Sequence, residues 1–356
     1  MGLFKDMLAG NETLFRSEDA LDPDYVPKLL PFRDQQQKAI ARNIGPLLEK
    51  RNGTNVFVHG APGIGKTVAI KWVFRDLEEE SDDVCIVYVN CWQRTTSYQI
   101  LLEICSELGY AFTQNKRQDE LMEIIKGICN KKSAVFCFDE IDKADDLDFL
   151  YSILQDILKR SVILITNYKE WLGDLEQRVA SRLVPSVVEF KPYSEHETRE
   201  ILKQRMGIAF VPGCWSADAF EVVVKKAADA GDLRMGLFLL RQAALIAEQA
   251  SSKRITLEHA MASIKKLDDM AVHKTEDLSD DTKLVFDVIK NSGGGKSGDL
   301  FKLYKEKGGE GTYKTFSRRI EKLQKAGLIK LNKQLGGAEG STTHITLSSA
   351  KKLDDF

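Results

Sequence analysis

A short glycine-rich segment combines the residue types that bind phosphate. Residues 59–70 read HGAPGIGKTVAI and match the pattern G-x-x-x-x-G-K-[ST] between an apolar run and a helix-forming sequence. In such a loop, backbone N–H groups turn inward around the β-phosphate, and the next helix presents its positive end. Lys66 would reach the β- and γ-phosphates, and the Thr67 hydroxyl would bind Mg²⁺, so the segment predicts a nucleoside triphosphate site. Its residues are Gly60, Ala61, Pro62, Gly63, Ile64, Gly65, Lys66, Thr67 and Val68.

A pair of carboxylates supplies the second half of this chemistry. In residues 135–142, VFCFDEID, four apolar residues place Asp139 and Glu140 at the carboxyl end of a buried strand, where ligands of parallel sheets collect. Asp139 would hold Mg²⁺, and Glu140 would orient or deprotonate the attacking water. Adjacent carboxylates can also mark a simple turn, but the phosphate-binding loop upstream favours the catalytic interpretation.

Four further polar residues could complete the site. Asn167 ends the next strand-like run, SVILITN, and could position the same water or only cap the strand. Arg178 and Arg182 lie four residues apart on one helix face; either could act on a neighbour's nucleotide as an arginine finger, or form a surface ion pair. Arg234, at the start of a later helix, could be brought onto the γ-phosphate.

The elements that must position these residues alternate along the first half of the chain. Short β-branched runs are separated by helical stretches, which predicts a mostly parallel sheet with helices on both faces. The strands then stop, and four helices follow; residues 194–197, SEHE, have the form of a capping box. The expected strands lie within 55–60, 84–90, 134–140 and 161–167, and the later helices open near Ser194, Ser216, Asp232 and Thr256.

The last quarter of the chain is basic and has a different pattern. Residues 296–333 hold eleven lysines or arginines against four acidic residues. Within 311–329, Phe316, Ile320 and Leu323 form one apolar helix face, between a Thr312 N-cap and Gly327. Two short helices, this basic helix and a following hairpin predict a winged helix, whose third helix enters the DNA major groove. A solvated basic face or a protein-binding winged helix is the alternative. The predicted DNA contacts are Thr312, Lys314, Ser317, Arg318, Arg319, Lys322 and Lys333.

Composition sets the broad class and the domains. The chain has 356 residues, 43% hydrophobic and 29% charged, with a net charge of −2. Its six cysteines contain no CxxC pair, so we expect reduced thiols rather than disulfides or metal ligands. The sequence has no apolar run of membrane length and no signal-like N-terminus, so we expect a cytoplasmic, nucleoid-associated protein. The predicted domains are 1–192 (α/β, nucleotide-binding), 193–272 (helical), 273–281 (linker) and 282–356 (winged helix).

Together these motifs resemble the archaeal origin-recognition and helicase-loader (Orc/Cdc-type) initiators of the AAA+ superfamily. The resemblance covers nearly the whole chain, from DALDPDYVPKLLPFRDQQ (19–36) through FKPYSEHETREILKQR (190–205) to the winged-helix segments. It implies a P-loop AAA+ α/β domain, a small helical lid and a C-terminal winged helix. It gives Asn167 the sensor-1 role and Arg234 the sensor-2 role, and it favours Arg182 as the finger. It adds Val26, Pro27, Arg33 and Tyr193 to the nucleotide site.

The resemblance also carries functional expectations. Members bind ATP or ADP with Mg²⁺ and hydrolyse ATP slowly. They recognise duplex DNA at replication origins through the winged helix and an insertion in the ATPase domain. They also help to recruit the MCM helicase. Paralogous initiators are possible partners. The nucleotide is then expected to be a switch rather than a fuel.

Three departures leave other hypotheses open. The hairpin tip carries Glu339, the segment 109–121 near the expected DNA-binding insertion is short, and Phe32 replaces the family's histidine before Arg33. A divergent paralogue could act as a DNA-binding regulator of replication or transcription. A transcription regulator could keep the nucleotide only for structure. A clamp-loader-like or transposition-helper ATPase would instead remodel partners with brisk turnover.

Overall fold

The computed structural model of the chain describes residues 13–276, 280–325, 329–334 and 342–347. The chain divides into two compact units, 1–257 and 258–356. This boundary falls inside the segment 193–272, which the sequence predicts to be a separate helical domain.

The first unit contains a five-stranded parallel sheet with strand order β2-β3-β4-β1-β5. Four of its strands lie where the sequence predicts them. The fifth was not predicted, because only one of its four side chains is buried and it therefore lacks an apolar run. The strands are β1 (Val56–His59), β2 (Val84–Asn90), β3 (Ser133–Asp139), β4 (Arg160–Thr166) and β5 (Ser186–Glu189).

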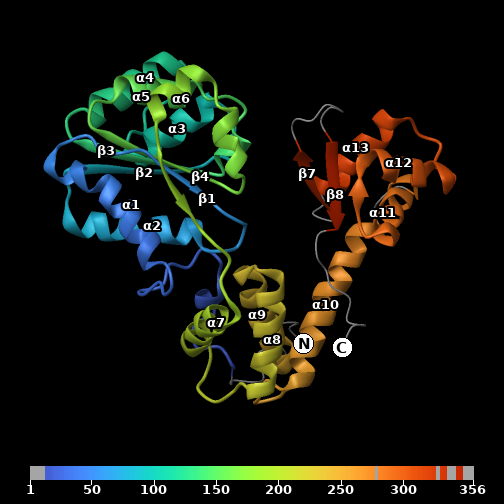
Figure 1. Ribbon diagram of the computed structural model, residues 1–356. Helices are drawn as coiled ribbons and strands as arrows, with labels where there is room; N and C mark the ends of the chain where they lie inside the picture. Colours follow the sequence, from blue (N-terminus) through green and yellow to red (C-terminus); the bar gives the residue numbers. More distant parts are fainter. Residues whose placement is uncertain (1–12, 277–279, 326–328, 335–341, 348–356) are drawn as a thin grey trace. The chain divides into compact units, whose positions relative to one another are not determined.

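Helices cover both faces of this sheet, as expected (Figure 1). One layer buries Ile70 and Phe74 of α2 against Val58 and Ile163. The other layer packs its helices against the opposite side chains of β3 and β4, such as Phe136. The first layer contains α1 (Asp34–Ile44) and α2 (Lys66–Glu80), and the second contains α3 (Ser97–Glu107), α4 (Gln118–Cys129), α5 (Asp148–Asp156) and α6 (Gln177–Leu183). Short 3₁₀ segments are η1 (Glu18–Leu21), η2 (Gly45–Glu49), η3 (Ile141–Lys143) and η4 (Lys169–Asp174).

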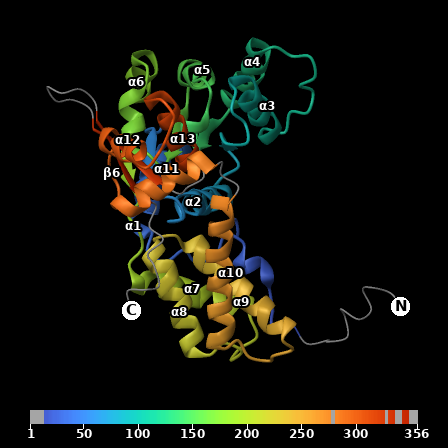
Figure 2. The same cartoon turned by 90° about the vertical axis from the view of Figure 1, so that its right-hand side faces the viewer.

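Three helices of the same unit form the lid: α7 (Glu195–Ala209), α8 (Ala217–Ala230) and α9 (Leu233–Gln249) (Figure 2). Their predicted N-cap positions are confirmed. The Ser194 and Glu197 side chains exchange hydrogen bonds with each other's backbone, as the capping-box sequence predicts.

The second unit contains the winged helix. Phe316, Ile320 and Leu323 are buried, which confirms the predicted apolar face of the third helix. The predicted linker at 273–281 is wrong in part, because helix covers residues up to 276 and again from 280. The helices are α10 (Leu257–Glu276), α11 (Asp280–Ser292), α12 (Ser297–Glu306) and α13 (Tyr313–Lys325), and the antiparallel sheet β6-β8-β7 contains β6 (Gly295–Lys296), β7 (Ile329–Gln334) and β8 (Thr342–Leu347).

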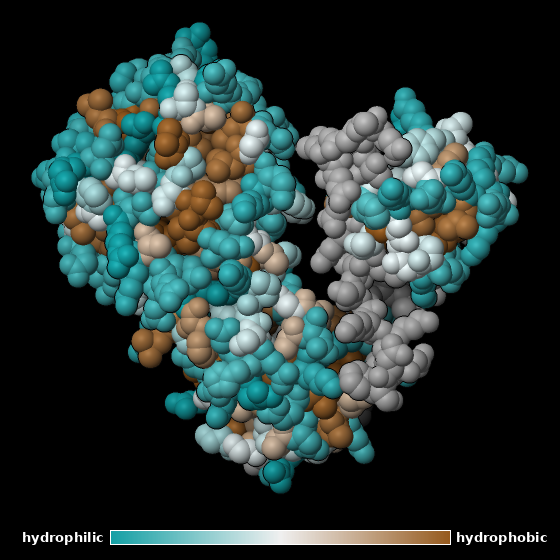
Figure 3. Space-filling view, in the orientation of Figure 1, coloured by the Kyte–Doolittle hydropathy of each residue, from teal (hydrophilic) through white to brown (hydrophobic). Residues whose placement is uncertain are grey.

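The surface seen in Figure 3 is mostly hydrophilic, with separate apolar patches. Among the described helices, none is both long and apolar enough to cross a membrane. All six cysteines are free thiols, and five of them are buried.

Candidate nucleotide-binding site

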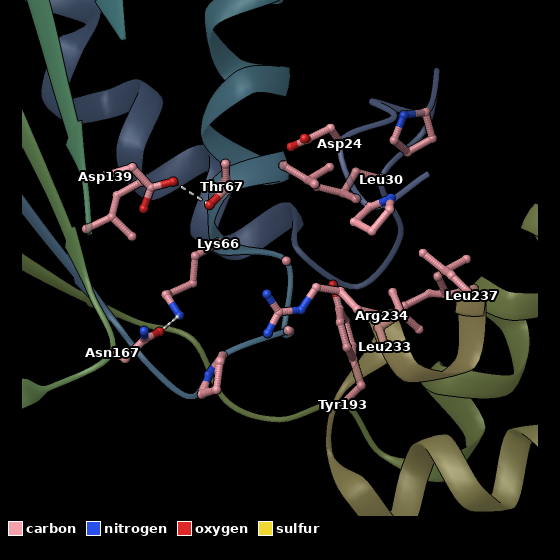
Figure 4. A pocket seen from close by; sticks show the side chains of 18 of the residues that line it. Asp24, Leu30, Lys66, Thr67, Asp139, Asn167, Tyr193, Leu233, Arg234 and Leu237 are labelled. Carbon is pink, nitrogen blue, oxygen red and sulfur yellow. Dashed lines mark hydrogen bonds between the residues drawn. The ribbon is translucent and has the colours of Figure 1, made fainter. Parts of the chain in front are cut away.

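A cavity of about 310 Å³ opens where the carboxyl ends of the strands meet the start of the lid (Figure 4). The phosphate-binding loop, the acidic pair and the lid all contribute to its wall, so the structure brings together motifs that lie far apart in the sequence. The predicted residues that line it are Pro27, Pro62, Gly63, Gly65, Lys66, Thr67, Val68, Asp139, Glu140, Asn167, Tyr193 and Arg234.

Lys66 is a buried cation in the wall of this cavity. Its ammonium donates to the Gly60 and Ala61 carbonyls at 2.7 and 2.8 Å, and to Asn167 Oδ1 at 2.8 Å. Burial lowers the pKa of Lys66 to about 8; Asp139 opposes this shift, and the positive charge of Arg234 adds to it. These three neutral acceptors form weaker hydrogen bonds with the ammonium than an anion would, so phosphate oxygens could replace them.

Asp139 is fixed by three donors. Its Oδ2 accepts from Thr67 Oγ1 at 2.6 Å and from the Tyr88 hydroxyl at 2.8 Å, and its Oδ1 accepts from the Glu140 N–H at 2.9 Å. A carboxylate beside a hydroxyl offers the oxygen ligands that Mg²⁺ prefers, so these residues fit that ion. The sequence analysis did not single out Tyr88; its only signal was a polar tip on a strand that leads into the site.

Glu140 has a left-handed backbone with φ of 54°. This region is uncommon for a residue with a β-carbon and marks strain that often occurs at functional sites. Burial raises the pKa of Glu140 above its usual value, and the negative charges of Asp139 and Asp142 raise it further. A more basic carboxylate is a better acceptor for the proton of an attacking water.

Arg234 projects from the first turn of α9 toward the phosphate-binding loop (Figure 4). Its guanidinium forms an ion pair with Asp232 at 3.1 Å. It also lowers the pKa of Lys66 by charge repulsion, which shows that the lid cation and the loop cation share one electrostatic environment. Tyr193, just before α7, also reaches the loop, with its hydroxyl 3.0 Å from where a β-carbon on Gly65 would be.

Arg33 lies beneath the loop and does not line the cavity. One of its amino groups donates to the Ile64 and Lys191 carbonyls at 2.9 and 2.8 Å, and its guanidinium lies 3.7 Å from the centre of the Tyr193 ring. Arg33 therefore joins the loop to the segment that leads into the lid.

Some of the other residues of this N-terminal segment line the cavity and others, like Arg33, do not. Pro27, Leu30 and Pro31 line the cavity, whereas Val26 does not. Phe32, with φ of 63°, lies edge-on to His196 at 6.3 Å and does not line the cavity either.

We expect Arg33→Ala to lower the free energy of unfolding by about 3 kcal/mol, because it removes the donor to the buried Ile64 carbonyl and the part-buried Lys191 carbonyl and also removes a stacked cation. Urea unfolding of nucleotide-free protein measures this loss. Arg42→Ala, at an exposed position of α1, is the control and should change it by less than about 0.5 kcal/mol. An unchanged stability with a lost preference for adenine over guanine would instead place Arg33 against the base.

The two candidate finger residues share one aromatic neighbour. Arg178 and Arg182 both lie over the Tyr151 ring, at 5.4 and 5.1 Å. Arg178 is also paired with Asp148 at 2.8 Å and Glu176 at 2.6 Å. Arg182 is exposed on α6 and lies outside the wall of this cavity.

Comparison with known proteins identifies the family. An AAA domain model matches residues 49–170, and a Cdc6 AAA+ ATPase-type lid domain model matches residues 199–264. Over 363 aligned residues, the chain is 30% identical to the ORC1-type DNA replication protein 2 of Methanothermobacter thermautotrophicus, with 95% of this chain and 93% of the relative covered. The chain belongs to the ORC1-type DNA replication protein family.

Solved structures agree with this ORC1-type assignment. The Aeropyrum pernix ORC1 protein, solved in complex with DNA, matches with a TM-score of 0.70 and 29% identity over 94% of both chains. Cdc6p from Pyrobaculum aerophilum, at 20% identity and a TM-score of 0.65, matches in fold over 95% of both chains. The predicted family and its architecture, an AAA+ domain with a Cdc6-type lid and a winged helix, are therefore confirmed.

Proposed function

We propose that this ORC1-type protein is an ATP-regulated initiator that binds double-stranded DNA at replication origins and helps to recruit the MCM helicase. ATP hydrolysis is slow and acts as a switch. The observation that carries the proposal is the shared cavity, in which Lys66 of the phosphate-binding loop and Arg234 of the lid face the same space. A γ-phosphate contacting both would bias the lid, which is how a bound nucleotide controls conformation without rapid turnover.

The chemistry assigned to the site follows from its contacts. Thr67 and Asp139 would hold Mg²⁺, which neutralises charge on the phosphates. Glu140 would accept a proton from the attacking water, and Asn167, already bonded to Lys66, would orient that water. Arg182 would act on the nucleotide of a second initiator subunit, identical or paralogous.

The DNA-binding part of the proposal depends on α13. Its buried residues fix which side faces outward, and Lys314, Arg318 and Lys322 are exposed there. The Aeropyrum ORC1 structure contains DNA, which supports the same activity for this chain. Thr312 and Ser317 flank this exposed side, while the Lys333 side chain, Gly327 and the hairpin tip with Glu339 lie outside the described residues.

Arg319 is placed differently from its neighbour. It donates to the buried Tyr304 hydroxyl and pairs with Asp281 at 2.6 Å, with 16% of its side chain exposed. We therefore propose that Arg319 stabilises the winged helix by joining α13 to α12 and α11, and that Arg318 contacts DNA.

We expect Arg318→Ala to weaken origin DNA binding by roughly 1–3 kcal/mol, about five- to 150-fold, with unfolding unchanged. Arg319→Ala should instead lower the free energy of unfolding by about 1–3 kcal/mol, because it removes the hydrogen bond to the Tyr304 hydroxyl and the ion pair with Asp281. Fluorescence anisotropy and thermal unfolding measure the two effects. Arg318→Lys is the control for charge alone. The opposite result for the two arginines would contradict the assignment.

The function as a whole is tested by mapping the protein on its host's chromosome by crosslinking. Binding peaks at replication start sites that change in the Glu140→Gln variant, together with co-purification of MCM, support a nucleotide-switched initiator. Peaks at promoters that are indifferent to Glu140→Gln would instead indicate a transcription regulator. ATP turnover of several per second stimulated by DNA would indicate a remodelling ATPase.

A further inference from the structure

The contact between the lid and the phosphate-binding loop contains an acidic residue that the proposed function leaves unassigned. Asp232 immediately precedes α9, and its Oδ1 accepts from the Arg234 N–H at 2.9 Å as the N-cap of that helix. The same carboxylate binds the Arg234 guanidinium through two hydrogen bonds, from Nε at 3.2 Å and from a terminal amino group at 3.1 Å. Asp232 thus fixes both the backbone and the side chain of the lid arginine.

Asp232 also touches the loop itself. A β-carbon on Gly63 would lie 1.9 Å from Asp232 Oδ1 and 2.2 Å from its Cγ, and the next residue, Leu233, donates its N–H to the Gly63 carbonyl at 3.2 Å. The P-loop pattern leaves position 63 open to any residue. Here the missing side chain at Gly63 makes room for a carboxylate from the lid.

A carboxylate at this place acts against the binding of a triphosphate in two ways. It competes with the γ-phosphate for the Arg234 guanidinium, because a bidentate ion pair occupies the donors that a phosphate oxygen needs. It also brings a negative charge to the outside of a loop whose inside attracts anions. The competition for Arg234 matters for the γ-phosphate and not for a diphosphate, so its effect differs between ATP and ADP.

We propose that Asp232 is a specificity-determining residue of the nucleotide site, which holds Arg234 at the lid and thereby reduces the selection of nucleoside triphosphate over diphosphate. This inference rests on the proposed function, in which Arg234 contacts the γ-phosphate. By reciprocity, a triphosphate that captures Arg234 weakens the Asp232–Arg234 pair and with it the contact of Asp232 with Gly63. Asp232 acts through Arg234 and is a positioning residue.

The test compares equilibrium affinities of the full chain for ADP and for a non-hydrolysable ATP analogue, both with Mg²⁺. Asp232→Asn removes the charge and keeps an N-cap acceptor. We expect it to raise the ratio of the ADP dissociation constant to that of the analogue by about three- to tenfold. Asp232→Ser, a second uncharged N-cap residue, should give the same change, so that a folding defect of one variant does not decide the result.

A double-mutant cycle with Arg234→Ala separates this role from simple capping. In the Arg234→Ala background, Asp232→Asn should leave the ratio unchanged, because the competed guanidinium is gone. The inference would be overturned by an unchanged ratio in Asp232→Asn, or by an equal change of the ratio when Asp232→Asn is made in the Arg234→Ala background. In either case, nucleotide binding by the wild type would still support the proposed function. A wild-type protein that binds neither nucleotide would overturn the proposed function and this inference with it.

Discussion

Replacing Glu140 with glutamine is expected to lower the rate of ATP hydrolysis by about 10²- to 10⁴-fold, the usual contribution of a positioned general base. The reason is local: Glu140 directly follows Asp139, the proposed Mg²⁺ ligand at the tip of β3, and burial keeps the pKa of Glu140 raised. Glutamine has the same shape but cannot accept a proton. Single-turnover hydrolysis of ATP measures the change.

Nucleotide binding should survive this substitution, because Lys66 and Thr67 remain in place. Isothermal titration with ADP should give an affinity within about threefold of the wild type, a difference of less than 1 kcal/mol. Glu170→Gln, at an exposed position of η4, is the matched control and should hydrolyse ATP normally. Normal turnover in Glu140→Gln would assign the base to another residue.

Replacing Gly60 with alanine is expected to cost about 3 kcal/mol of stability and to abolish tight nucleotide binding. The added β-carbon would lie 2.3 Å from the Phe190 carbonyl oxygen, which is backbone and cannot turn away. The Phe190 N–H is itself bonded to the His59 carbonyl at 2.9 Å, so the ends of β1 and β5 would have to separate. The backbone at Gly60, with φ of 151°, also suits glycine alone.

Denaturant unfolding and titration with ADP measure the two losses. Gly127→Ala provides the control: this glycine lies in α4 at an exposed position, where an added β-carbon would meet nothing within 4 Å beyond the backbone of its own helix. Alanine there should stabilise the chain by about 0.5–1 kcal/mol. If Gly60→Ala were as stable as the wild type, the strand ends would have to be more adaptable than this packing implies.

Most correct predictions about the fold came from local sequence patterns. The loop at 59–70, the apolar strand before Asp139 and the N-caps of the lid helices are each determined within a few residues of chain. β5 lacked such a pattern, because it is held at the edge of the sheet by pairing with β1 rather than by burial of its own side chains. The stretch at 273–281 looked like a linker because it is polar and acidic, yet helix covers residues up to 276 and from 280.

The site residues that sequence reasoning missed act through contacts between distant segments. Tyr88 reaches Asp139 from the neighbouring strand, and Asp232 reaches Gly63 from the lid; neither contact leaves a trace in local spacing. Arg319 is different, because its structural role had a signal. It lies three residues after Phe316 and four before Leu323, on the apolar side of α13, where a charged residue must find buried partners.

The left-handed backbone of Glu140 has a consequence for how this protein can change under selection. A β-carbon in that region costs about 1 kcal/mol, and glycine would remove the cost. Glutamate and glycine codons differ by a single nucleotide, so on the proposed role of Glu140 a more heat-resistant protein with impaired ATP hydrolysis is one mutation away. A library screened for thermal resistance alone is expected to favour Glu140→Gly, and on the proposed role of Glu140 such variants would retain the bound triphosphate.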